Sequence, residues 1–278
     1  MSAAEDRPLI LVTNDDGVLA PGLATLVRAV EGFGEVVVCA PDTERSGQSQ
    51  AITLHSHLRA TRVRDRWWAV NGTPVDCVYL ASLHLCDRRP DLVVSGINPG
   101  HNLGTDVFYS GTVGAAAEGF IRGAPSIAFS VPHGQPAEIA VPWVKRLCGQ
   151  LLARAERMLI NVNLPEVMSL REREAALPIS AAALEKRAAA LPSRLTRMGQ
   201  RVYREHVEER QDLRGRPYFW IGGPPEESPH LEGEDTWAIA QGMVAITPLV
   251  LDISAPDLRP YEHLVASIGD LDGSIDLS

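Results

Sequence analysis

The sequence predicts an α/β fold: a doubly wound, mostly parallel sheet followed by a β-rich C-terminal appendage. Two patterns predict it. Short continuous apolar runs, typical of strands buried on both faces, alternate with longer segments of helical periodicity, as in β-α-β units. Polar, glycine-rich turns follow these apolar runs, and open α/β sheets bind their ligands at the carboxyl ends of the strands.

The predicted elements follow one another regularly along the first part of the chain. A buried strand at residues 9–13 precedes a helix that begins at Pro21 and ends near Gly32 and Gly34. Further strands are predicted at residues 36–40, 92–95 and 126–131, and further helices at residues 75–85, 112–121 and 139–158.

The pattern changes after Pro165, which divides the chain into three predicted parts. Residues 1–165 form the α/β core. Residues 166–195 form an insertion rich in Ala, Glu and Arg, interpreted either as helical or as a mobile excursion. Residues 196–278 form the β-rich appendage and the C-terminal end, with strand-like pieces at residues 202–207, 218–221 and 243–247.

Composition limits the class of protein. Of 278 residues, 45% are hydrophobic and 22% charged, which is ordinary for a globular protein and argues against global disorder. The net charge of −9 argues against a protein that binds a nucleic-acid duplex or an anionic membrane through its overall charge. None of the four cysteines lies in a CxxC pair, and we interpret Cys39 and Cys77 as core thiols. No signal peptide or long apolar span is visible, so we expect a cytoplasmic protein.

The first candidate site follows the strand at residues 9–13, in the sequence Asn14-Asp15-Asp16-Gly17. Two adjacent carboxylates repel each other unless a cation lies beside them. Because all the ligands here are oxygens, Mg²⁺ or Mn²⁺ fits better than zinc. The alternative interpretation is a solvated turn, in which Asp and Gly are common.

Two glycine-containing loops follow other predicted strands. In the loop at residues 40–49, Ser46 offers a hydroxyl ligand and Gly47 an open backbone N–H, although a polar loop with a capping serine is the alternative. In the loop at residues 95–104, Asn98 can give a neutral oxygen to a cation, and the glycines let the backbone approach a phosphate. A single glycine-rich loop is weak evidence, and neither loop matches a dinucleotide or Walker motif.

A fourth candidate lies where Tyr109-Ser110-Gly111-Thr112 enters the predicted helix at residues 112–121. A helix N-terminus presents N–H groups to an anion, although simple N-capping is the alternative. All four pieces are expected at one edge of the sheet. Together they supply what is needed to hold a phosphoryl group with a divalent metal.

The chain resembles the stationary-phase survival protein (SurE) family. The segments that carry the resemblance lie between about residue 9 and about residue 250: ILVTNDDGVLAPGL, VCAPDTERSGQS, NGTPVDCVYLA, DLVVSGINPGHNLGTDVFYSGTVGAAAEG, INVNLP and MVAITPL. The Ala/Glu/Arg-rich stretch at residues 166–192 departs from the family pattern, because it is longer than the usual connection.

The resemblance implies a Rossmann-like core and a hydrolase of the 5′-nucleotidase type, which uses one divalent metal ion per subunit. The implied substrates are nucleoside 5′- and 3′-monophosphates, sometimes short polyphosphate. The implied assembly is a homodimer or homotetramer with an exchanged C-terminal element. The metal ligands fall on Asp15, Asp16, Ser46 and Asn98, with Asp15 and Asp16 also catalytic, and the phosphate-binding residues are Asn14, Gly47, Asn102, Ser110, Gly111 and Thr112.

Two other functions stay open at this point. A phosphatase with a covalent aspartyl nucleophile would place its two aspartates one residue apart, whereas Asp15 and Asp16 are adjacent. A nucleotide-sensing module would bind the same substrate without hydrolysing it. Neither the general acid nor the general base is identified, although His101 lies close to the glycine-rich loop.

Overall fold

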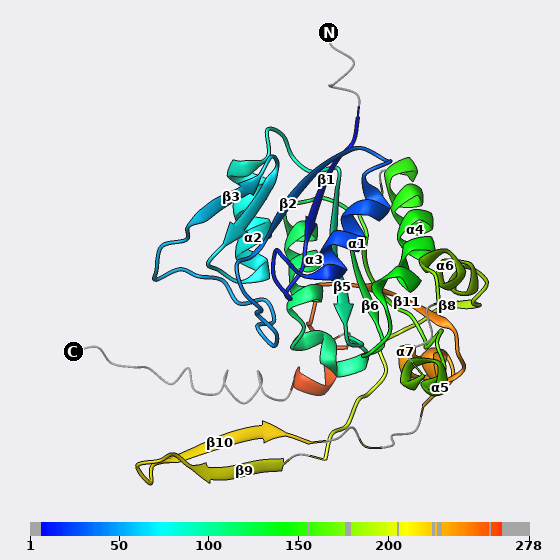
Figure 1. The fold of residues 1–278 in the computed structure, drawn as a ribbon. Helices are drawn as coiled ribbons and strands as arrows, with labels where there is room; N and C mark the ends of the chain where they lie inside the picture. Colours follow the sequence, from blue (N-terminus) through cyan, green and yellow to red (C-terminus); the bar gives the residue numbers. More distant parts are fainter. Residues whose placement is uncertain are drawn as a thin grey trace.

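A nine-stranded sheet forms the centre of the computed structural model, which describes residues 7–154, 156–175, 179–204, 206–223, 226, 230–255 and 257–262. The strand order is β3-β4-β2-β1-β5-β6-β7-β11-β8, and β9 and β10 form a separate hairpin (Figure 1). The strands are β1 (Leu9–Thr13), β2 (Glu35–Pro41), β3 (Ala60–Arg64), β4 (Trp67–Val70), β5 (Leu92–Pro99), β6 (Ser126–Val131), β7 (Leu159–Asn163), β8 (Ser193–Leu195), β9 (His206–Gln211), β10 (Pro217–Gly222) and β11 (Val244–Leu249).

Helices cover both faces of this sheet. The α-helices are α1 (Pro21–Val30), α2 (Pro74–Leu80), α3 (Gly111–Ile121), α4 (Val141–Arg154), α5 (Leu170–Glu174), α6 (Ala181–Ala189) and α7 (Asp235–Ala240). The shorter helical turns are η1 (Ala81–Leu85), η2 (Gly104–Phe108), η3 (Ala137–Ala140) and η4 (Arg259–Tyr261). Within the described part of the chain, no helix has the length and apolar character needed to cross a membrane.

Strand β1 lies inside the sheet and is buried on both faces. It pairs in parallel with β2 on one side and with β5 on the other. Ile10 and Val12 join the apolar cluster that contains α1 and α4, whereas Leu9 and Leu11 join the cluster that contains α2. Burial on both faces explains why this strand is a continuous apolar run rather than an alternating one.

The connections leave β1 and β5 in opposite directions. From β1 the chain passes through α1 to β2, and from β5 it passes through η2 and α3 to β6 on the other side. The sheet therefore reverses its strand order between β1 and β5. In doubly wound sheets, a crevice for ligands lies outside the carboxyl ends of the two strands at this point.

The predicted α/β architecture is confirmed, with four strands that the sequence pattern did not reveal. The hairpin of β3 and β4 and the strands β7 and β8 were not predicted. The helix predicted at residues 139–158 is wrong at its end, because α4 stops at Arg154 and β7 begins at Leu159. Strand β7 carries two buried asparagines, Asn161 and Asn163, which interrupt the apolar pattern expected of a buried strand.

The C-terminal part is divided differently from the prediction. The strand predicted at residues 243–247 exists, but as β11 it pairs with β7 in the main sheet, with Ala245 opposite Asn163. The strand predicted at residues 202–207 begins instead at His206, because Tyr203 is hydrogen-bonded to Asp106 and belongs to a connecting segment. Only β9 and β10 form the predicted β-hairpin; the domain boundaries themselves remain a prediction.

The insertion at residues 166–195 is helical in its described residues and packs on the core. Leu184 and Ala188 of α6 are buried in the cluster formed with α1 and α4. The indole N–H of Trp143 on α4 donates to the carbonyl oxygen of Ala188 at 2.9 Å. The interpretation as a mobile excursion is therefore wrong for α6.

This packing predicts a stability difference between two positions of α6. Leu184→Ala removes a buried side chain and leaves a cavity, so it should lower the free energy of unfolding by about 2–4 kcal/mol. Lys186→Ala, at an exposed position of the same helix, should change it by less than about 0.5 kcal/mol. Urea denaturation followed by circular dichroism measures both. Equal small effects would show that α6 does not pack on α4 in solution.

Candidate active site

The candidate site lies at the carboxyl ends of β1 and β5, which are neighbours in the sheet. Thr13, the last residue of β1, is opposite Ser95 of β5. The acidic turn follows Thr13 directly, and β5 continues through Asn98 to Pro99. The pairing of the two strands brings the acidic turn and the glycine-rich loop together, as the sequence predicted.

The acidic turn is braced by its first residue. The side-chain amide of Asn14 donates to the carbonyl oxygen of Gly17 at 3.1 Å and accepts from the Gly17 N–H at 3.2 Å. Gly17 has a φ of +104°, a conformation that side chains other than glycine rarely adopt. Asn14 is fully buried, so the structure uses it to shape the turn; its contact with a phosphate stays a prediction that this pairing does not favour.

The two carboxylates have different surroundings. Asp15 is 4% exposed and accepts a hydrogen bond from the Thr112 hydroxyl. Asp16 is partly exposed, but its Oδ2 atom is buried and has no hydrogen-bond partner among the described residues. Burial raises the pKa of both groups, and for Asp16 burial together with the charges of Asp15 and Glu44 raises the pKa to about 7. The protein alone thus leaves this pair of like charges poorly stabilised.

The loop that carries Ser46 lies beside this pair. The backbone N–H of Arg45 donates to the carbonyl oxygen of Asp15 at 2.7 Å. Ser46 is exposed, and its hydroxyl donates to Glu44 at 2.8 Å. Gly47, also exposed, has nothing within 4 Å of the position that a Cβ atom would occupy. The loop therefore presents an accessible hydroxyl and an open backbone near Asp15.

Asn98 and Asn102 are held in different ways. The Asn98 side-chain nitrogen donates to the carbonyl oxygen of Gly100 at 2.7 Å, which leaves its amide oxygen as the atom for a cation. Asn102 is 7% exposed, and its side-chain nitrogen donates to the Ser130 hydroxyl at 2.9 Å. His101 is partly buried, and its Nε2 atom lies 2.7 Å from the carbonyl oxygen of Leu164.

The N-terminus of α3 closes the site on the other side. Ser110 caps the helix by accepting from the Val113 N–H at 3.1 Å. A Cβ atom on Gly111 would lie 3.0 Å from the Cβ of Asp15, so the start of the helix touches the acidic turn. The first amides of a helix have no partner within it and favour an anion. An anion held at Gly111 and Thr112 would therefore lie next to the two carboxylates.

Comparison with known proteins agrees with this arrangement. The family model described as Survival protein SurE matches residues 10–205. A protein named 5′-nucleotidase SurE from Sorangium cellulosum (strain So ce56) is 43% identical over 272 residues, which cover 94% of this chain and 96% of the relative. A protein of the same name from Myxococcus xanthus (strain DK1622) is 42% identical over 91% of this chain and 93% of its own.

This chain belongs to the SurE family. The crystal structure of the SurE protein from Aquifex aeolicus superposes with a TM-score of 0.74 at 34% sequence identity, covering 93% of this chain and 100% of that protein. The predicted family and the predicted fold are thereby confirmed. The individual roles of the site residues are not tested by these similarities and remain proposals.

The SurE site has the chemistry expected for a hard divalent cation. In the part of the chain that the structure describes, no group of three or more His, Cys, Asp and Glu side chains is arranged to hold a metal. A cation would therefore need neutral oxygens besides Asp15 and Asp16, and Asn98 and Ser46 are the predicted residues that would offer them. The buried, unpartnered Oδ2 of Asp16 is the observation that fits, because a cation would satisfy this atom.

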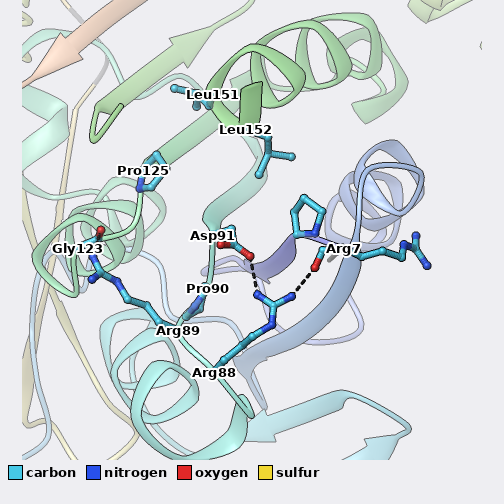
Figure 2. Close-up of a pocket in the computed structure, with 10 residues that line it drawn as sticks. Arg7, Arg88, Arg89, Pro90, Asp91, Gly123, Pro125, Leu151 and Leu152 are labelled. Carbon is cyan, nitrogen blue, oxygen red and sulfur yellow. Dashed lines mark hydrogen bonds and ion pairs between the residues drawn. The ribbon is translucent and has the colours of Figure 1, made fainter. Parts of the chain in front are cut away.

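A cavity lies at the edge of the sheet opposite to these site residues. Its volume is about 460 Å³, and it is bordered by residues that precede β1 and β5 (Figure 2). The Arg88 guanidinium donates to Asp91 at 2.6 Å and to the carbonyl oxygen of Arg7. This arginine therefore ties the chain's own segments together, and the cavity contains none of the predicted site residues.

Supporting residues that the sequence analysis missed surround Asn102. Its backbone N–H donates to Asn163 Oδ1 at 2.8 Å, and its carbonyl oxygen accepts from Asn161 and Asn163 at 2.7 and 3.0 Å. The available signal was the alternation of two asparagines with apolar residues in β7. Buried asparagines in a core strand require partners, and the glycine-rich loop is the partner here.

The unpaired carboxylate predicts opposite effects on stability and activity for Asp16→Asn. A folded-state pKa above the unfolded value means that the ionised Asp16 destabilises the metal-free protein at neutral pH. The variant should therefore have a higher Tm than the wild type without metal, but a smaller rise in Tm on adding Mn²⁺. Its phosphatase kcat/KM should fall by about 100-fold or more. Calorimetry measures the Tm values, and a phosphatase assay over a range of Mn²⁺ concentrations measures kcat/KM. Near-normal activity of the variant at saturating Mn²⁺ would show that Asp16 is not a metal ligand.

Proposed function

We propose that the chain is a divalent-metal-dependent 5′-nucleotidase that hydrolyses nucleoside 5′-monophosphates, and also 3′-monophosphates, to nucleoside and phosphate. The observation that carries this proposal is the contact of the acidic turn with the N-terminus of α3, in a chain of the SurE family. The named relatives are 5′-nucleotidases, and they match over nearly the whole chain.

The charges of the site explain why a metal is needed. Burial, together with the charges of Asp15 and Glu44, raises the pKa of Asp16. A phosphate dianion would be repelled by these acidic groups. We assign Mg²⁺ or Mn²⁺, one per subunit, to Asp15, Asp16, Asn98 and Ser46. When bound, such a cation supplies positive charge to the phosphate and makes water a better nucleophile at neutral pH.

Residues of the chain bind the phosphate and stabilise its charge. Amides at the start of α3, together with Ser110, orient the phosphate and stabilise negative charge on its oxygens during water attack. Asn102 and Gly47 border the same anion. The Thr112 hydroxyl donates to Asp15 and so fixes one carboxylate. Asp16 contributes Oδ2, which has no partner among the described residues. Which carboxylate accepts the proton from water is not assigned.

An apolar cavity beside Asp16 offers room for the organic part of the substrate. Its volume is about 450 Å³. Asp16 forms part of its wall, and its apolar lining includes Pro21, Ile97, Val131 and Pro136. Drug-sized ligands occupy cavities of about 300–1,000 Å³, with mostly apolar walls. We therefore place the nucleoside in this cavity, with its phosphate toward α3.

A phosphate-release assay tests the proposed activity. The purified protein should release phosphate from a panel of 5′- and 3′-nucleoside monophosphates with Mn²⁺ or Mg²⁺, with kcat on the order of 1–100 s⁻¹. EDTA should abolish release and added metal should restore it. Short polyphosphate in the same panel tests that further substrate. Nucleotide binding without any release at saturating metal would favour the sensing module instead.

The exposed hairpin supports a proposal about assembly. Phe219, Trp220 and Ile221 of β10 are 58%, 61% and 89% exposed, and the hairpin extends away from the main sheet (Figure 1). A two-stranded hairpin is marginally stable in water by itself. We propose that it packs on a second copy, in a cytoplasmic homodimer or homotetramer. Trp237 lies on α7 and is not part of the hairpin.

Replacing the aromatic side chains of the hairpin tests this assembly. The double variant Phe219→Ser and Trp220→Ser should lower the mass measured by light scattering at micromolar concentration, because it removes apolar area from the proposed interface. Leu83→Ser, at a position that is 60% exposed and outside the hairpin, should leave the mass unchanged. A wild-type monomer, or equal masses for all three proteins, would exclude assembly through the hairpin.

A further inference from the structure

Asp235 is a buried carboxylate that the proposed reaction does not use. It begins α7 and is 0% exposed. Three backbone N–H groups donate to it, those of Gly104, Gly199 and Thr236, each at 2.8 Å. The Gly104 bond uses Oδ2 and the other two use Oδ1, so both oxygens are occupied. Burying a charge is costly, and here backbone donors compensate for the lost water.

Gly104 connects Asp235 to the glycine-rich loop of the site. It follows Asn102 closely and begins η2, the turn that leads to Ser110. Its φ is +50°, and a Cβ atom at this position would lie 2.6 Å from the carbonyl oxygen of Gly199. The two glycine backbones thus touch each other, and their amides are held by the same carboxylate.

The segment around Gly199 also forms hydrogen bonds with the rest of η2. The Thr105 hydroxyl donates to the carbonyl oxygen of Arg201 at 3.1 Å. The Asp106 carboxylate accepts from the Arg201 guanidinium at 2.8 Å and from the Tyr203 hydroxyl at 2.6 Å. The carbonyl oxygen of Asp106 in turn accepts from the Ser110 N–H at 3.1 Å. Hydrogen bonds therefore run from Asp235 through η2 to the start of α3.

We propose that Asp235 is a positioning residue for the phosphate-binding side of the site. Its carboxylate fixes the backbone of Gly104, and through η2 it fixes Ser110 and the N-terminus of α3. This inference rests on the proposed function. A carboxylate is required because both of its oxygens accept; the amide nitrogen of an asparagine would face at least one of the three backbone N–H groups with a donor in place of an acceptor.

The position of Asp235 separates phosphate binding from metal binding. Asp15 and Asp16 follow β1, and Asn98 lies within β5. The pairing of these strands holds Asp15, Asp16 and Asn98, the loop after β2 carries Ser46, and Asp235 makes no hydrogen bond to these ligands in the described structure. Helix α3 reaches this set through the Thr112 hydrogen bond to Asp15. Loosening η2 should therefore weaken phosphate binding far more than metal binding.

Asp235→Asn tests the proposal in the full-length protein. Electron paramagnetic resonance of Mn²⁺ gives the metal Kd, and calorimetry with inorganic phosphate on the Mn²⁺-loaded protein gives the phosphate Kd. The phosphate Kd and the KM for a nucleoside monophosphate should each rise by about tenfold. This is the lower end of the range of affinity losses seen when a residue that supports a binding group by hydrogen bonds is replaced. The metal Kd should change by less than about twofold, within the factor expected for an untouched site.

Asp91→Asn is the matched control at the opposite edge of the sheet. Asp91 is exposed, and its Oδ2 atom accepts from the backbone N–H of Leu9 at 2.7 Å and from Arg88 (Figure 2), so the same change replaces a carboxylate that binds a backbone N–H far from the site. It should leave both Kd values and KM unchanged. If Asp235→Asn does not fold, Asp106→Asn loosens η2 from its other end and should raise the phosphate Kd in the same selective way.

Three results would overturn the proposal: unchanged phosphate affinity with only a lower Tm, equal weakening of metal and phosphate, or the same weakening in the Asp91→Asn control. Wild-type protein assayed alongside separates this inference from the proposed function. If the wild type turns over substrate and the Asp235→Asn variant has the same phosphate Kd and KM, only the positioning role is contradicted. Absence of wild-type turnover contradicts the nucleotidase itself.

Discussion

The repulsion between two adjacent carboxylates is the constraint on which the rest of the site depends. Asp15 and Asp16 are held at the end of a buried parallel strand, where water cannot fully solvate them. The fold provides Asp15 with a donor, the Thr112 hydroxyl, but leaves Oδ2 of Asp16 without one among the described residues. A proton or a cation bound beside Asp16 would relieve this repulsion, and at neutral pH a cation would do so while both carboxylates stay ionised, which is why we propose a metal here.

The surrounding structure keeps this pair in place from three directions. Asn14 braces the turn, the Arg45 amide holds the carbonyl oxygen of Asp15, and the start of α3 packs against its side chain. None of these contacts neutralises the charge. They restrict the backbone, so that the ligand atoms are prearranged before metal or substrate arrives. Such preorganisation lets a site stabilise developing charge without reorganising during the reaction.

The sequence predicted the core of the fold and the location of the site because both depend on local patterns. The apolar run before Asn14 and the glycines and proline after it identify a buried strand and the turn that follows. The long-range supports were not predictable in the same way. Asn161 and Asn163 reach Asn102 from β7, and Asp235 reaches Gly104 from a segment far along the chain. Nothing local in the sequence states which backbone amides a buried polar side chain will meet.

The same reason explains the misplaced C-terminal strand. Residues of β11 look like any short apolar strand, and their assignment to the main sheet depends on pairing with β7, whose buried asparagines concealed it. The strand predicted at residues 218–221, by contrast, exists as part of β10, and its apolar side chains Phe219 and Trp220 are exposed in the single chain.

Anomalous diffraction from crystals soaked in Mn²⁺ measures most directly whether the acidic pair is a metal site. One strong peak per subunit should lie about 2.0–2.4 Å from oxygens of Asp15 and Asp16, with the side-chain oxygen of Asn98 also within reach, as expected for oxygen ligands of such a cation. A peak elsewhere on the protein, or none beside Asp16 at saturating Mn²⁺, would contradict the metal-dependent mechanism.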